Sequence, residues 1–159
     1  MLVVVIMGSP SDEPIGQRIT RVLDDFDIPW EMRVASAHKV PRYVLNMLAE
    51  YEADPRPKVY VTVAGRSNAL SGLVDAQVSA PVIACPPYSD KFGGGDLLSS
   101  LRMPSGVAPA VVLEPENAAL LAAKMLGLAE PDLRQKVQAA QEKQRQRLFD
   151  ADAAHHPAR

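Results

Sequence analysis

The sequence predicts an α/β fold, in which a parallel sheet lies between two layers of helices. The apolar run 2–7 is rich in β-branched residues and shows no polar alternation, which is typical of a strand buried on both faces of a parallel sheet, and residues 58–64 form a second segment rich in β-branched residues. Helix-like segments alternate with such runs, as expected of βαβ units. The length of 159 residues fits a single domain, with a core over residues 2–127 and a C-terminal helix and tail over 131–159.

The first strand, residues 2–7, should lie in the middle of the sheet because all of its residues are apolar. Gly8 then allows a tight turn, and Ser11 or Asp12 is expected to cap a helix that has Pro14 in its first turn. Apolar residues at helical spacing support this helix: Ile15, Ile19, Val22, Leu23 and Phe26.

A second unit of the same kind follows. Residues 29–34 predict a strand, residues 36–39 a loop, and Pro41 the first turn of a helix. The expected inward face of this helix comprises Val44, Leu45, Leu48 and Ala49.

The third unit begins with a strand at residues 58–64 and continues through a polar loop at 65–68 into a helix at 69–77. Residues 81–85 and 108–113 predict the fourth and fifth strands.

Helices and one glycine-rich loop account for the rest of the chain. The glycine triplet 93–95 is too compact for a linker and predicts a mobile loop and the start of a short helix that runs through Leu101. Acidic residues at 114–117 suit the start of a helix to Leu126. Pro131 opens a last helix, which either crosses to a neighbouring subunit or is solvated and frays toward the tail. Its apolar stripe is thin and comprises Leu133, Val137, Ala140 and Leu148.

The strand order places the candidate site. Two orders are common for such sheets, 2-1-3-4-5 as in flavodoxin-like folds and 3-2-1-4-5, and we favour the first. Ligands bind outside the carboxyl ends of the strands, near the point where the strand order reverses. The loops at 8–12, 36–39 and 65–68 are therefore expected to form one pocket.

The side chains of this pocket suit a sugar phosphate. Hydroxyl groups, helix N-termini and Lys39 suit a phosphate, and Asp12 can accept hydrogen bonds from sugar hydroxyls. His38 is the only histidine before the tail, and its imidazole can take and return a proton near neutral pH. The whole set comprises Ser9, Ser11, Asp12, Ser36, His38, Lys39, Arg66, Ser67 and Asn68.

A purely structural interpretation of residues 36–41 stays open, in which Ser36 caps the helix, Lys39 is a solvated charge and His38 is a hydrogen-bonded loop residue. No phosphate-loop motif is present and no dinucleotide fingerprint opens the first helix. No cluster of carboxylates or histidines indicates a metal, and the pair His155 and His156 in the tail is a weak site. We expect neither cofactor nor metal.

Composition argues against several classes of partner. A net charge of −2 gives no electrostatic reason to bind nucleic acid or an anionic membrane. No apolar run approaches the ~20 residues of a membrane span and residues 2–7 lack the basic lead-in of a signal peptide, so we expect a cytoplasmic protein. The single cysteine, Cys85, excludes an internal disulfide, and its place at the end of an apolar run predicts a buried structural thiol.

Several ordered motifs resemble those of the PurE family of purine biosynthesis, over about residues 2–127. They are 7–12 (MGSPSD), 36–41 (SAHKVP), 64–68 (AGRSN), 81–83 (PVI), 99–106 (SSLRMPSG) and 117–119 (NAA). The resemblance implies a substrate with a ribose 5-phosphate and an aminoimidazole ring, and assembly into a tetramer or octamer. It also implies that Ser9 and Asp12 contact ribose and phosphate, that Ser36 and Lys39 bind phosphate and that His38 is the acid and base. Residues 65–68, namely Gly65, Arg66, Ser67 and Asn68, would line the carboxylate end.

The second and third loops differ from those of the larger bacterial branch of this family, which has Ser-Ala-His-Arg and Gly-Gly-Ala-Ala-His there. Lys39 and Arg66-Ser67-Asn68 instead resemble the class II branch, whose members carboxylate aminoimidazole ribonucleotide with carbon dioxide and include the vertebrate fused enzyme. This resemblance implies a carboxylase. The alternatives are a mutase that moves a carboxylate from the exocyclic nitrogen to the ring, and a non-catalytic nucleotide-binding module.

Overall fold

The computed structural model describes residues 1–156 and contains a five-stranded sheet in which all neighbouring strands are parallel. The strand order is β2-β1-β3-β4-β5, which confirms the favoured flavodoxin-like order. The strands are β1 (Leu2–Met7), β2 (Trp30–Val34), β3 (Lys58–Val63), β4 (Val82–Ala84) and β5 (Ala110–Val111).

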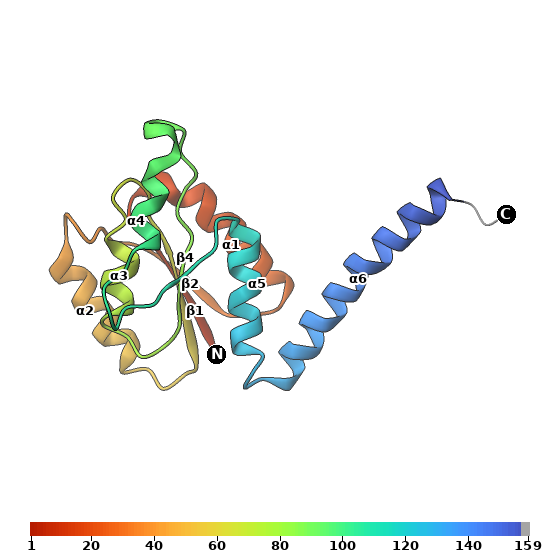
Figure 1. The fold of residues 1–159 in the computed structure, drawn as a ribbon. Coiled ribbons are helices and arrows are strands. Elements are labelled where there is room, and N and C mark those ends of the chain that lie inside the picture. Colours follow the sequence, from red (N-terminus) through yellow and green to blue (C-terminus); the bar gives the residue numbers. More distant parts are fainter. Residues whose placement is uncertain (157–159) are drawn as a thin grey trace.

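Helices cover both faces of the sheet, so the three-layer α/β/α prediction is confirmed (Figure 1). Helices α1 (Glu13–Asp25) and α5 (Pro115–Leu126) pack on one face, and α2 (Pro41–Glu52) and α3 (Leu70–Asp75) pack on the other. The remaining helical segments are the 3₁₀ turns η1 (Pro10–Asp12) and η2 (Lys91–Leu97) and the helices α4 (Leu98–Leu101) and α6 (Pro131–His155). Within residues 1–156, no helix is both long and apolar enough to cross a lipid bilayer.

Strand β1 lies at the centre of the sheet and is buried throughout, as its all-apolar sequence predicts. Alternate residues point to opposite faces: Val3 and Val5 join the core under α1 and α5, whereas Val4 and Ile6 join the core under α2 and α3. At its end, Met7 is opposite Val34 of β2 and Val63 of β3 in the parallel register. Three strands therefore end at one level, and the loops that follow them leave the sheet side by side.

The inward face of α2 differs from the sequence prediction. Val44 and Leu48 are buried as expected, but Leu45 and Ala49 are exposed, and Met47 and Tyr51 take their places. The buried positions follow the spacing i, i+3, i+4, i+7 from Val44. The observed and predicted faces differ by part of a turn, because α2 packs with Met47 and not Leu45 against the sheet.

The last predicted strand and the first predicted cap are also corrected. Strand β5 is two residues long, instead of the six residues 108–113, since Pro109 has no N–H to donate and β5 is an edge strand. Asp12 occupies the N-cap position of α1 without a side-chain capping bond, and the capping hydroxyl belongs to Ser9, which accepts from the Ser11 N–H in η1.

Helix α6 leaves the domain after its first turns and projects away from the sheet (Figure 1). Leu133 and Val137 are buried against the core, whereas Leu148 and Phe149 are 71% and 62% exposed. The predicted apolar stripe of α6 is therefore buried in the first turns of the helix and exposed near its end. Most of α6 has no partner among residues 1–130.

Candidate functional site

A cavity of about 620 Å³ opens at the carboxyl ends of β1, β2 and β3, where the sequence predicts a single pocket. Its walls come from a first loop (residues 8–12), a second loop (35–40), a third loop (64–69) and a fourth loop (85–97). The polar residues among its lining are Ser9, Ser11, Asp12, Ser36, His38, Lys39, Arg66, Ser67, Ser89, Lys91 and Asp96.

Backbone contacts hold the first three loops together at the floor of the cavity. The Gly8 N–H donates to Val63 O at 2.8 Å, and the Ala35 N–H donates to Met7 O at 2.8 Å. A Cβ atom at Gly8 would lie 3.2 Å from the Ala64 Cβ, which is tighter than an ordinary van der Waals contact. Glycine at position 8 therefore permits the close approach of the first and third loops.

The first loop presents hydroxyl groups and one carboxyl group. The Ser9 hydroxyl oxygen accepts hydrogen bonds from the Ser11 N–H at 3.3 Å and the Ser11 hydroxyl at 2.9 Å. Partial burial raises the pKa of the Asp12 carboxyl group, and a hydrogen bond from the Ser9 backbone and the positive charge of Arg66 oppose this shift. The Asp12 carboxyl group is thus a partly desolvated hydrogen-bond acceptor under the influence of the Arg66 charge.

The second loop carries the predicted proton carrier. Its turn is held by Ser36, whose hydroxyl oxygen accepts from the Lys39 N–H at 3.3 Å and whose carbonyl oxygen accepts from the Val40 N–H at 3.0 Å. The side chains of His38 and Lys39 are exposed and line the cavity. Ser36 therefore shapes the turn, while the imidazole and the ammonium group are accessible to a ligand.

The third loop contributes Gly65, Arg66 and Ser67 to the cavity wall, but Asn68 does not line the cavity. Asn68 is 5% exposed; its amide nitrogen donates to the Ser100 hydroxyl at 2.9 Å, and its amide oxygen accepts from the Ser71 N–H at 3.2 Å. The contact between Asn68 and a substrate, which the sequence motif implies, stays a prediction. In this structure its side chain anchors the loop to α4 and α3.

The fourth loop was missing from the predicted site. It brings Pro87, Ser89, Lys91 and Asp96 to the cavity and adds a cation and a carboxylate. The glycine triplet of this loop predicts a mobile loop and a helix start, and neither feature indicates a place in the cavity wall. The strand order does predict this contribution, because β4 lies next to β3 and the loop after β4 leaves the same edge of the sheet.

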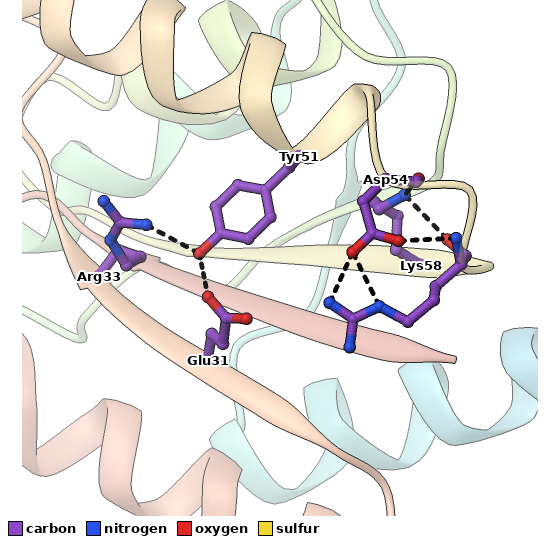
Figure 2. Close-up of polar contacts among 6 residues, drawn as sticks. Glu31, Arg33, Tyr51, Asp54 and Lys58 are labelled. Carbon is purple, nitrogen blue, oxygen red and sulfur yellow. Dashed lines mark hydrogen bonds and ion pairs between the residues drawn. The ribbon is translucent and has the colours of Figure 1, made fainter.

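A second polar cluster lies outside the cavity, around β2, the end of α2 and the start of β3 (Figure 2). The Tyr51 hydroxyl donates to Glu31 at 2.5 Å and accepts from Arg33 at 3.0 Å. Lys58 donates to the Asp54 and Arg56 carbonyl oxygens at 2.6 and 2.8 Å. Each of these groups is bonded within the cluster, which joins α2 to the sheet.

Two further features of the sequence are the single cysteine and the possible metal ligands. Cys85 is fully buried and burial raises the pKa of its thiol to about 12, which confirms the prediction of a structural cysteine. Among residues 1–156, no three histidine, cysteine or acidic side chains are grouped so as to hold a metal ion.

Comparisons with known proteins agree with the fold and the motifs. The model of the family described as AIR carboxylase matches residues 2–147. The phosphoribosylaminoimidazole carboxylase of Archaeoglobus fulgidus is 57% identical over 152 residues, covering 96% of this chain and 83% of that relative. The phosphoribosylaminoimidazole carboxylase of Treponema denticola is 50% identical over 152 residues, which are 96% of this chain and 96% of that relative.

Two further comparisons define the extent of the relationship. The human bifunctional phosphoribosylaminoimidazole carboxylase/phosphoribosylaminoimidazole succinocarboxamide synthetase is 47% identical over 127 residues, which are 80% of this chain and 30% of that protein. The crystal structure of Treponema denticola PurE superimposes with a TM-score of 0.95 at 50% identity, covering 96% of this chain and 97% of that one. The chain belongs to the AIR carboxylase (PurE) family.

Proposed function

We propose that this enzyme carboxylates 5-aminoimidazole ribonucleotide with carbon dioxide to give 4-carboxy-5-aminoimidazole ribonucleotide, without ATP and without a metal ion. The observation that carries the proposal is the position of His38. Its exposed side chain lines the cavity at the carboxyl ends of the central strands, next to Lys39 in the chain and together with residues of the first and third loops.

The cavity walls supply what the nucleotide requires. Ser9 and Asp12 are proposed contacts for the ribose and phosphate, because hydroxyl groups donate to phosphate oxygens and a carboxylate accepts from sugar hydroxyls. Lys39 and the turn that Ser36 shapes are proposed to bind the phosphate. The aminoimidazole ring would then extend toward the third loop.

The reaction needs little catalytic machinery. The exocyclic amino group pushes electron density onto the adjacent ring carbon, which attacks carbon dioxide and forms the new carbon–carbon bond. The ring carbon must then lose its proton for the ring to become aromatic again. His38 is proposed to accept that proton and return it to solvent, a role that one imidazole can fill near neutral pH.

The lining of the third loop supports the proposal that free carbon dioxide, and not an N-carboxylated substrate, supplies the carboxyl group. Arg66 and Ser67 both line the cavity. The bulk of these two side chains would leave too little space for a carboxylate carried on the exocyclic nitrogen while leaving room for free carbon dioxide, and steric exclusion of a competing substrate is a common source of specificity. The mutase reaction is therefore the less favoured alternative.

We also propose that the enzyme is a homo-oligomer, a tetramer or an octamer, in which α6 crosses to a neighbouring subunit. Support comes from the direction of α6 away from the sheet (Figure 1) and from the exposed Leu148 and Phe149 near its end. Symmetric assembly is the usual way to cover such residues.

An absorbance assay tests the catalytic proposal. Purified protein is mixed with aminoimidazole ribonucleotide and bicarbonate as the source of carbon dioxide, without nucleotide and with EDTA. We expect formation of the carboxylated product at a rate proportional to enzyme concentration. Absence of product, or activity that requires an added divalent metal or ATP, would contradict the proposal.

A further inference from the structure

Ser99, in the short helix α4, bridges the two ends of the loop that carries Arg66. The Asn68 N–H donates to the Ser99 hydroxyl oxygen at 2.9 Å, and the same hydroxyl group lies 3.0 Å from the carbonyl oxygen of Arg66, to which it can donate. Arg66 and Asn68 are only two residues apart. One hydroxyl group therefore closes the turn between them.

The same hydroxyl group also connects two walls of the cavity. It lies 2.7 Å from the carbonyl oxygen of Asp96, so its single proton is shared between the carbonyl groups of Asp96 and Arg66. Both of these residues line the cavity, one from the fourth loop and one from the third. Ser99 thus links the third loop to the end of the fourth loop at Asp96.

Arg66 needs such support because of its backbone conformation. Its φ is +58°, in the left-handed region that side-chain-bearing residues rarely adopt. Within residues 1–156 the other non-glycine residues with positive φ are Asp27 and Phe92, neither of which lines the 620 Å³ cavity. A residue persists in this region only where neighbouring contacts determine its conformation.

A buried pair fixes the far end of the same loop. The Asn68 amide nitrogen donates to the hydroxyl oxygen of Ser100, which is 1% exposed, at 2.9 Å. The adjacent serines of α4 thus have different tasks: Ser100 anchors Asn68, and Ser99 closes the turn at Arg66. The two serines are separated from the third loop by more than thirty residues of sequence.

We propose that Ser99 is a positioning residue for this enzyme: it holds Arg66 in the left-handed conformation and thereby keeps the guanidinium group in the cavity. The proposal rests on the carboxylase function proposed above. Without the hydroxyl group, the Asn68 N–H and the Arg66 carbonyl lose their shared partner. Arg66 then relaxes toward negative φ, and its side chain leaves the position in which it faces the substrate.

The kinetic test compares Ser99→Ala and Ser99→Thr with the wild-type enzyme. We expect Ser99→Ala to lower kcat/KM by about 10- to 100-fold, the usual effect of misplacing a group that contacts substrate, with little change in Tm. Ser99→Thr keeps the hydroxyl group and should restore most of the activity. The matched control is Ser79→Ala, which removes a hydroxyl group that donates to Glu52 at 3.0 Å away from the cavity and should leave kcat/KM unchanged.

A double-mutant cycle separates positioning of Arg66 from general support of the fold. In an Arg66→Gly background there is no side chain to position, and glycine adopts positive φ freely. Adding Ser99→Ala to Arg66→Gly should therefore lower kcat/KM by less than about twofold relative to Arg66→Gly alone. An equal loss in both backgrounds would overturn the proposal. If Ser99→Ala does not fold, Ser99→Cys, which keeps the size of the side chain but forms weaker hydrogen bonds, takes its place in the cycle.

Amide hydrogen exchange gives a readout that does not depend on catalysis. The backbone N–H of Asn68 should exchange faster in Ser99→Ala than in the wild type. The Ser79→Ala control should leave its exchange rate unchanged. Faster exchange in a protein that turns over no substrate would contradict the carboxylase function and leave the role of Ser99 in the loop supported. Unchanged exchange together with unchanged kcat/KM would overturn the role of Ser99.

Discussion

Asp12 and Arg66 line the same cavity, and the positive charge of Arg66 lowers the pKa of the Asp12 carboxyl group against a larger opposing effect of burial. The net result is a raised pKa. The folded state therefore holds this proton to a higher pH than the unfolded chain does, so the contribution of Asp12 to stability is most favourable below its ordinary pKa of 3.8 and declines as the pH rises through the folded value.

The first prediction follows from this sign. Asp12→Asn removes a partly desolvated charge, so its Tm at pH 7 should equal or exceed that of the wild type, while KM for the ribonucleotide should rise because a charged acceptor is lost. Thermal denaturation and initial-rate kinetics measure both quantities. Asp24→Asn is the matched control, since Asp24 accepts from the Trp30 indole at 2.7 Å outside the cavity and should leave KM unchanged. A lower Tm with an unchanged KM would refute the prediction.

The second prediction concerns His38. His38→Asn should reduce turnover by about 10²- to 10⁴-fold, the usual contribution of a general base, while the ribonucleotide still binds through its phosphate and ribose. Steady-state kinetics and isothermal titration calorimetry separate the two effects. A variant that keeps more than about a tenth of the wild-type activity would remove His38 from the proton-transfer role.

The third prediction concerns the buried thiol. Because burial raises the pKa of Cys85 to about 12, only about one molecule in 10⁴ carries the thiolate at pH 8. Ellman's reagent should therefore not label the native protein, and should label one thiol per chain in guanidinium chloride. Rapid labelling of the native enzyme with loss of activity would show instead that Cys85 is accessible and near the site.

The fourth prediction concerns α6. The double variant Leu148→Glu/Phe149→Glu should keep its circular dichroism spectrum but assemble into smaller particles by light scattering, because both side chains are exposed in the single chain and are proposed to be covered by a neighbour. Leu128→Glu is the control, since Leu128 is 84% exposed in the turn before α6. A wild-type protein that is a fully active monomer would contradict the proposed assembly.

The fold was predictable because its signals are local. Strand β1 has the bounds that its apolar run predicts, Leu2–Met7, and α2 and α6 begin at the prolines that the sequence indicates, Pro41 and Pro131. The prediction of the buried face of α2 was wrong where two nearby apolar residues could each occupy the buried position. Leu45 and Met47 are both apolar, and only the packing of α2 on the sheet determines which of them is buried.

The position of the candidate site was predictable where its residues share one local motif, and less so where contacts between distant segments decide the geometry. Ser36, His38 and Lys39 lie in one short loop, and the strand order brings that loop to the cavity. The orientation of Asn68 depends on Ser100 in another helix, and the conformation of Arg66 depends on Ser99. Neither partner can be inferred from periodicity or from composition.

The source of the transferred carboxyl group tests the central claim most directly. Aminoimidazole ribonucleotide with carbon dioxide and, separately, the N-carboxylated ribonucleotide are supplied to the enzyme, the latter with a carbon dioxide scavenger present, and the carboxylated product is measured. We predict product from free carbon dioxide and almost none from the N-carboxylated compound, because Arg66 and Ser67 line the cavity where its carboxylate would lie. Efficient conversion of the N-carboxylated compound under scavenging would identify a mutase and contradict the account.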